Sequence, residues 1–274
     1  MEGPSHHLGP GPSSQGVSPP GPFRVEVVEV TGSTNSDLAQ RAHAGEPAGL
    51  VLRTEHQTAG RGRLDRAWEA PSGANLLFSV LLRPDWPSGR VPLVTSALAV
   101  SLTAVLEGPL ADLGLAPAVK WPNDVVLVDS AGSTVGKVAG ILAELVDADP
   151  PSVVVGMGVN VGWPEAGDGP PGAVSLRTAG LDAEVDGVLP LVLDAFGSWC
   201  EALGGDDGDG RLRVEHLRRS ATVGRRVSVE LADGPMEAVA VDIALDGGLV
   251  LDVEGQLVEV RAGDVVHLRA DVPD

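Results

Sequence analysis

Three arginines interleaved with glycines stand out in segment 54–70, TEHQTAGRGRLDRAWEA, where they occupy positions Arg61, Arg63 and Arg66. Forked guanidinium donors bind carboxylates and phosphates, and the neighbouring glycines allow the backbone to approach a ligand closely. Gly-Arg runs are also common in mobile surface segments, so this segment alone favours that simpler interpretation. Its spacing matches neither a P-loop nor a dinucleotide-binding fingerprint.

Charged and amide residues at the edges of apolar segments strengthen the case for a ligand site. KWPND begins at Lys120, KVAGILAE begins at Lys137, and GMGVN begins at Gly156. A single lysine at the start of a buried strand often only extends its ammonium group to solvent. Two lysines, Asp124 and an arginine loop together favour a site for a small, discrete anion.

Charge and composition exclude several classes of partner. The chain has 274 residues and a formal net charge of -19, so its surface repels phosphate and we expect no nucleic-acid partner. No run of about 18 residues lacks charge or turn residues, so we expect no membrane partner. Cys200 is the single cysteine, which excludes an intrachain disulfide and fits a cytoplasmic protein. We expect its side chain to be a small buried apolar group.

The pattern of elements that must position these residues indicates an α+β fold. Alternating or apolar segments predict strands over 23–30, from Gly49 and over 75–83, with a short helix over 31–45 between the first two. A buried helix is predicted from Val91. Segments 118–128, 137–146 and 152–163 predict three antiparallel strands, and two further helices are predicted from Gly187 and Arg211. Clustered strands with irregularly spaced helices favour α+β over a doubly wound sheet.

The composition also predicts how the chain divides. Residues 1–22 are rich in Gly, Pro and Ser and predict a disordered leader rather than a secretory signal. We expect a catalytic domain over 23–220, with a boundary near Ala221. Short alternating segments separated by turn signals over 221–270 predict a small β-barrel domain.

Six ordered motifs give the chain its resemblance to the biotin–protein ligases, the biotin–[acetyl-CoA-carboxylase] ligase family. The motifs, which span roughly 27–161, are TGSTN at Thr31, EHQTAGRGR at Glu55, GANL at Gly73, KWPND at Lys120, KVAGILAE at Lys137 and GMGVN at Gly156. The resemblance implies a mixed central β-sheet with flanking helices, followed by an SH3-like β-barrel. It also implies that ATP, with Mg²⁺, activates biotin to biotinyl-5′-AMP, and that the biotinyl group passes to a lysine of the biotin carboxyl carrier domain of acetyl-CoA carboxylase or a related carboxylase.

The resemblance also assigns expected roles to residues, and no resident metal site is expected. The expected catalytic residues are Arg63, Lys137 and Asp124, with Asp124 binding Mg²⁺, orienting the incoming lysine or only forming a turn. The expected biotin contacts are Ser33, Thr34, Asn35, Gln57, Arg61, Gly62, Arg63 and Lys137. The expected ATP contacts are Arg61, Arg63, Arg66, Trp68, Asn75, Lys120, Asn123 and Asn160. We expect the arginine loop to close over the water-sensitive adenylate.

Two departures from the family pattern concern Asp65, where many relatives have glycine, and a longer insert over 129–136. Three alternative functions remain open. A bifunctional ligase and repressor would need an N-terminal DNA-binding domain, for which 22 leader residues are too few. Lipoate or octanoate transfer would need a different glycine-rich signature, and a non-catalytic anion-binding module would need only the arginine loop. Either a monomer or a homodimer is compatible with the sequence.

Overall fold

The computed structural model describes residues 7–8, 23–64, 66–86, 88–148, 150–163, 169–231, 234–261 and 263–267. The predicted leader over 1–22 therefore lies outside the described residues, except for strand β1 (His7–Leu8). This strand pairs in parallel with β9 (Asp182–Ala183). Asp65 also lies outside the described residues.

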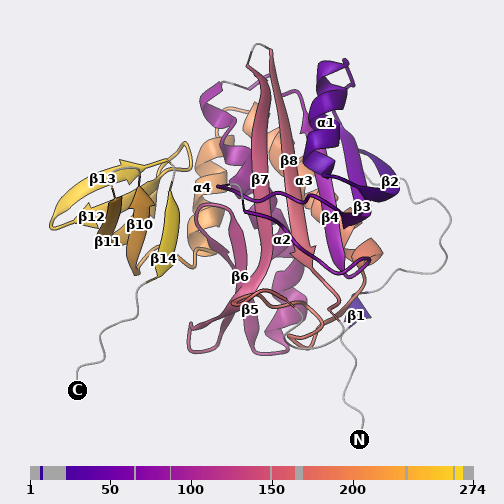
Figure 1. Ribbon diagram of the computed structural model, residues 1–274. Coiled ribbons are helices and arrows are strands. Elements are labelled where there is room, and N and C mark those ends of the chain that lie inside the picture. Colours follow the sequence, from indigo (N-terminus) through magenta and orange to yellow (C-terminus); the bar gives the residue numbers. More distant parts are fainter. Residues whose placement is uncertain are drawn as a thin grey trace, which may run out of the picture.

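A seven-stranded sheet forms the centre of the molecule (Figure 1). Its strands in chain order are β2 (Arg24–Thr31), β3 (Leu50–Gln57), β4 (Asn75–Leu82), β5 (Leu115–Lys120), β6 (Asp124–Asp129), β7 (Thr134–Ala148) and β8 (Pro151–Asn160). Their spatial order is β2-β3-β4-β8-β7-β6-β5. Only β2 and β3 pair in parallel, while the other neighbours within this sheet are antiparallel. The predicted mixed sheet and α+β class are confirmed.

The single strand predicted over 118–128 is wrong. The chain forms β5, turns over 121–123 and returns as β6, with Lys120 paired to Asp124. Pro122 has no N–H to donate to a strand ladder, so the strand is interrupted at this point. The turn therefore presents the centre of the KWPND motif at one end of the hairpin. The insert over 129–136 includes the last residue of β6, the turn over 130–133 and the first residues of β7.

Helices cover both faces of the sheet. Helix α1 (Thr34–His43) buries Leu38 and Ala42 on one face, against residues of β3, β4 and β8. On the opposite face lie α2 (Leu93–Ala111) and α3 (Val185–Gly204), preceded by the short 3₁₀ helix η1 (Ser88–Arg90). Helix α2 is long and apolar enough to cross a membrane by length and composition, but 67% of it is buried inside the fold, as in a core helix.

A second, five-stranded antiparallel sheet follows α4 (Gly208–Arg218). Its strands are β10 (Arg226–Leu231), β11 (Gly234–Ile243), β12 (Leu249–Val253), β13 (Gln256–Val260) and β14 (Asp264–His267). They are arranged in the order β13-β12-β11-β10-β14. Within the described part of the chain the two end strands do not pair, so closure into an SH3-like barrel stays a prediction. The domain boundary near Ala221 also stays a prediction.

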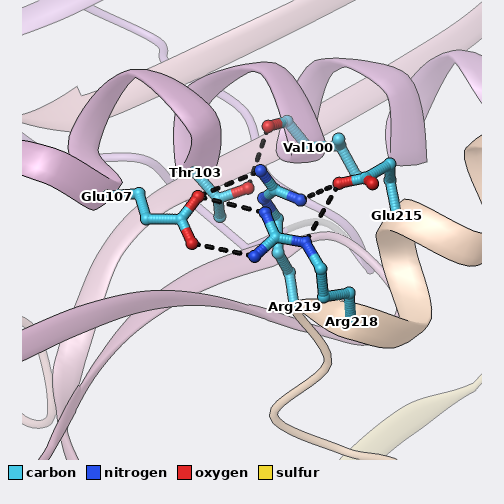
Figure 2. Close-up of polar contacts among 6 residues, drawn as sticks. All are labelled: Val100, Thr103, Glu107, Glu215, Arg218 and Arg219. Atoms are coloured by element: carbon cyan, nitrogen blue, oxygen red, sulfur yellow. Dashed lines mark hydrogen bonds and ion pairs between the residues drawn. The ribbon is translucent and has the colours of Figure 1, made fainter.

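Two sets of polar contacts fix the segment that leads from α4 into the second sheet. The segment after α4 runs along the free edge of β5, where Val119 N–H donates to Arg219 O and Ala221 N–H donates to Val119 O, each at 2.8 Å. An ion-pair cluster precedes it (Figure 2). Arg218 donates to both carboxylate oxygens of Glu107 on α2, at 2.9 and 3.0 Å. Arg219 also pairs with Glu107, at 3.1 Å. The cluster joins α2 to the end of α4, immediately before the chain enters the second sheet.

Candidate functional site

A cavity of about 350 Å³ lies on the face of the large sheet that α1 covers. The start of α1, the β3–β4 loop, the β5–β6 turn, β7, β8 and the start of β14 line it. Its volume falls at the lower end of the range of small-molecule pockets. Both sheets contribute to its wall, so the site lies where they meet.

The structure brings almost all of the predicted site residues to this cavity. The predicted residues that line it are Ser33, Thr34, Asn35, Gln57, Arg61, Gly62, Arg63, Arg66, Trp68, Lys120, Asn123, Asp124, Lys137 and Asn160. Asn75 is the exception, because its side chain is 1% exposed and lies beneath the cavity. There it donates to Asn160 at 2.9 Å and accepts from the indole of Trp163 at 2.8 Å.

Buried polar side chains form one end of the cavity, at the start of α1. Gln57 Oε1 accepts from the Thr34 backbone N–H at 2.9 Å and from the Thr34 hydroxyl at 3.1 Å. Asn35 accepts from Ser79 at 2.6 Å and donates to Leu142 O at 3.1 Å. Ser33 is the N-cap residue but makes no side-chain cap hydrogen bond. This linked network fixes amide and hydroxyl groups at this end of the cavity.

Glycines create the space above β7 and β8. A Cβ atom at Gly158 would lie 2.5 Å from Trp68 Cε2, and one at Gly140 would lie 2.8 Å from Trp68 Cζ3. A Cβ at Gly156 would collide with Asn35 Oδ1. These positions alternate with core residues along the strands, so they face the cavity. The GMGVN motif therefore places Trp68 flat against the sheet, where its buried indole N–H has no hydrogen-bond partner.

The described residues of the β3–β4 loop form a tight hairpin, which we call the arginine strap (residues 60–64 and 66–68). Gly62 N–H donates to Arg66 O at 2.7 Å, and Trp68 N–H donates to Gly60 O at 2.9 Å. A side chain at Gly60 would collide with the Trp68 carbonyl oxygen, so this position requires glycine.

Carboxylates hold the guanidinium groups of the arginine strap. Arg61 pairs with Glu144 on β7 at 2.7 Å, and Arg66 pairs with Asp264 on β14 at 2.5 Å. Arg63 lies 3.7 Å from Asp264. The protein's own carboxylates thus occupy the positions that an anionic ligand would seek.

Both lysines of the chain, Lys120 and Lys137, line this cavity. Lys137 Nζ lies 2.6 Å from Asp124 Oδ1 and 5.3 Å from the centre of the Trp68 ring. Its backbone is also fixed, because Asn160 donates to Lys137 O at 3.1 Å. The ammonium group is therefore held by a carboxylate and an aromatic face, next to the arginine strap.

Three side chains in this region were not assigned roles from the sequence. Glu144 lies at the end of the quoted motif KVAGILAE, and Trp121 lies inside KWPND. The motifs themselves could therefore have pointed to both residues. Asp264 had none, because it meets the arginine strap only through the packing of the second sheet. Its partner Arg66 is 198 residues earlier in the chain.

Two observations bear on the remaining chemistry. Among the described residues, no group of three or more His, Cys, Asp or Glu side chains is arranged to hold a metal ion. Cys200 lies on α3, away from the cavity, and burial raises the pKa of its thiol to about 12. Cys200 packs against the core of the large sheet, as predicted for a small apolar group, but its side chain is only partly buried rather than fully buried.

Two segments of the chain match known protein families. Residues 27–160 match the Biotin/lipoate A/B protein ligase family, and residues 222–268 match the Biotin protein ligase C terminal domain. A "Biotin--[acetyl-CoA-carboxylase] ligase" of Mycobacterium tuberculosis is 40% identical over 259 residues, which is 90% of each chain. The protein of that name from Paracoccus denitrificans is 34% identical over 231 residues, covering 81% of this chain and 91% of its own.

The fold has a solved counterpart as well. The structure of "Biotin protein ligase from Aquifex aeolicus in complex with biotin and ATP" superposes with a TM-score of 0.74 at 24% identity. The superposition covers 90% of this chain and 99% of that one. The two-sheet architecture described above is therefore shared with a solved structure.

Proposed function

The chain belongs to the biotin–protein ligases, within the biotin/lipoate A/B protein ligase family, and from that premise we propose that it is an ATP-dependent biotin–[biotin carboxyl-carrier protein] ligase. It converts biotin and ATP to biotinyl-5′-AMP and pyrophosphate. It then transfers the biotinyl group to a lysine of the carrier domain of acetyl-CoA carboxylase or a related carboxylase.

The two substrates take opposite ends of the cavity in this proposal. Biotin lies at the α1 end, where Ser33, Thr34, Asn35 and Gln57 offer the donors and acceptors that its ureido ring requires. ATP lies between the arginine strap and the β5–β6 turn. In support of this placement, the cationic and aromatic side chains of the strap and Lys120 line that end of the cavity.

The first step brings two anions together, and fixed positive charge offsets their repulsion. A carboxylate oxygen of biotin attacks the α-phosphorus of ATP, and the bond from that phosphorus to the oxygen of the leaving pyrophosphate breaks. Arg63 and Lys137 stabilise the charge on the phosphate and carboxylate oxygens, because their cationic groups are already held in place before the reaction. Arg61 and Arg66 exchange their contacts with Glu144 and Asp264 for contacts with the ligands.

Mg²⁺ enters with ATP, whose phosphate oxygens are the hard ligands that this ion prefers. Asp124 is the acidic side chain nearest to Lys137, and its carboxylate already receives that ammonium group at 2.6 Å. This contact favours a role for Asp124 in orienting Lys137 and the incoming amine over a role as a magnesium ligand.

The second step requires protection from water until the carrier arrives. Biotinyl-5′-AMP is a mixed anhydride, and the arginine strap folds over it to limit hydrolysis. The carrier lysine's neutral amine then attacks the acyl carbon, the bond to the phosphate oxygen breaks, and AMP leaves. We infer that this happens in the cytoplasm, since the chain's single cysteine needs no oxidising compartment.

One observation carries the proposal: the arginine strap, Lys137 and the polar pocket at the start of α1 converge on a single cavity. The decisive experiment incubates the protein with a biotin carboxyl carrier domain, biotin and MgATP, followed by mass spectrometry of the carrier. We expect the mass of one biotinyl group on one lysine, and none when ATP is omitted. Parallel reactions with lipoate or octanoate in place of biotin should leave the carrier unmodified. Modification by lipoate alone would contradict the proposal, as would the absence of biotin-dependent pyrophosphate release from a folded sample.

A further inference from the structure

Trp121 belongs by sequence to the KWPND turn of the large sheet, but its side chain lies in the core of the second sheet. The indole is 3% exposed and packs in one cluster with Val229, Leu251 and Val265. A buried tryptophan contributes a large apolar contact area, so this side chain is a strong link between the two sheets. The KWPND motif and the proposed chemistry do not explain why the Trp121 side chain lies in the core of the second sheet.

Two hydrogen bonds fix Trp121 to the second sheet. Its indole N–H donates to Gly247 O at 3.0 Å, in the turn between β11 and β12. Its backbone N–H donates to Thr222 Oγ1 at 3.1 Å. The same hydroxyl lies 3.3 Å from His267 Nε2 on β14. Trp121 is therefore linked to β14 in two ways, through the core that it shares with Val265 and through Thr222.

The other end of β14 meets the arginine strap. Arg63 donates to Gly263 O at 3.1 Å and to Asn123 Oδ1 at 3.2 Å, and it lies 3.7 Å from Asp264. Asn123 lies two residues after Trp121 in the same turn. The guanidinium of Arg63 is thus held between the KWPND turn and the start of β14, and its position depends on how these two segments dock.

We propose that Trp121 is a positioning residue of the ligase. By docking the second sheet onto the KWPND turn, it places Gly263 and Asp264 so that they hold Arg63 at the nucleotide end of the cavity. The inference rests on the proposed function, since it assigns Trp121 an effect on the first half-reaction. Small displacements of a charge-stabilising group lower the rate or weaken ATP binding, whereas the polar residues at the start of α1, which hold the ureido ring of biotin in the proposed function, keep their contacts.

The test compares Trp121→Phe with Leu251→Ala, using biotin-dependent pyrophosphate release and calorimetry with biotin alone. Phe keeps an aromatic ring but loses the hydrogen bond to Gly247 O. Leu251 is fully buried in the same core on β12, away from the arginine strap, and its truncation damages that core while leaving both hydrogen bonds of Trp121 in place. We expect Trp121→Phe to raise the KM for ATP about 10-fold, with biotin affinity changed less than about 2-fold. Leu251→Ala should leave the KM for ATP within about 2-fold, despite lower stability.

Two further variants test the route through Thr222 and Arg63. Thr222→Val should shift the KM for ATP in the same direction as Trp121→Phe, and Thr222→Ser should restore the wild-type value. In an Arg63→Ala background, Trp121→Phe should have little additional effect, because both changes act on the same guanidinium.

The outcomes separate the inference from the proposed function. If Trp121→Phe and Leu251→Ala change the KM for ATP equally, or if Trp121→Phe leaves it unchanged, the positioning role is overturned while the function stands. If the wild-type protein releases no pyrophosphate with biotin, the proposed function itself fails.

Discussion

At the scale of single residues, Lys137 is held in place by several contacts and has a direct proposed role in stabilising charge during adenylate formation. Its ammonium group is held by Asp124 and lies over Trp68, and its backbone carbonyl accepts from Asn160. A cation restrained before the reaction loses little on reaching the transition state, which is why such groups contribute strongly to rate.

Replacing Lys137 with alanine should therefore reduce adenylate formation by about 10²-fold or more. The measurement is biotin-dependent pyrophosphate release at saturating biotin. Arg226→Ala is the matched control, because it removes a cation whose side chain is 64% exposed on the second sheet, away from the cavity. Near-normal turnover in Lys137→Ala would remove this residue from the proposed mechanism.

Gly158 tests whether the placement of Trp68 matters. A methyl group there would lie 2.5 Å from the indole, so Trp68 and the arginine strap must shift. We expect Gly158→Ala to reduce kcat/KM for ATP about 10²-fold. Gly108→Ala on α2 is the control, because a Cβ there meets nothing within 4 Å. Equal kinetics for the two variants would show that the close contact between Trp68 and β8 has no role.

At the scale of elements, α2 and α4 are joined by two different kinds of contact. One is the buried imidazole of His216 on α4, whose Nδ1 lies 3.1 Å from Ser96 Oγ on α2. The other is the ion-pair cluster at the end of α4, in which Glu107 and Arg218 are about half exposed and Arg219 is largely buried (Figure 2). The two contacts differ in how their contributions to stability respond to conditions. The contribution of His216 depends on pH, whereas that of the ion pairs is limited by solvent and salt.

His216 should make the fold sensitive to acid. Burial lowers the pKa of its imidazole from 6.5 to about 4, so the folded state favours the neutral form. The stability that the neutral imidazole contributes is fully present above pH 6.5 and is lost as the pH falls towards 4. The free energy of unfolding should fall by up to about 3 kcal/mol over this range. Urea unfolding from pH 7 to pH 4.5 should show this loss in the wild-type protein and a smaller one in His216→Leu. His43→Gln, at an exposed position, should keep the wild-type slope. Identical slopes for wild type and His216→Leu would refute the assignment.

The ion-pair cluster should contribute less to the free energy of unfolding than His216 does. Hydrogen bonds from Arg218 hold the pKa of Glu107 below its usual range, but this carboxylate is 49% exposed. Solvent screening limits exposed pairs, so Glu107→Gln should cost about 1 kcal/mol or less of unfolding free energy, and still less in 1 M salt. Glu237→Gln breaks a 3.8 Å surface pair with Arg226 and should cost close to nothing. A large effect of Glu107→Gln that is insensitive to salt would indicate a packing defect instead.

At the scale of the whole molecule, the sequence predicted the elements better than their assembly. The continuous apolar character of α2 and the alternation of the second sheet are local patterns, so the sequence shows them directly. The break at Pro122 was missed because segment 118–128 begins and ends with apolar residues, although Lys120, Asn123 and Asp124 lie close to the proline. The convergence of the motifs could be expected from their resemblance to a family, whereas the pairing of Arg66 with Asp264 depends on the docking of two sheets.

The arrangement of amines across the molecule has a chemical consequence for a protein that makes an activated acid. Of its 19 basic lysine and arginine residues, only Lys120 and Lys137 are lysines, and both lie in the cavity. Guanidinium groups stay protonated at neutral pH and are poor acyl acceptors. Any biotinyl-5′-AMP that escapes would therefore meet no lysine amine on the exterior of the enzyme. Incubation with biotin and MgATP but no carrier should leave the exterior unlabelled by mass spectrometry, apart from any terminal amine. A lysine introduced by Arg226→Lys should become an acceptor, and its failure to do so would mean that the adenylate does not escape.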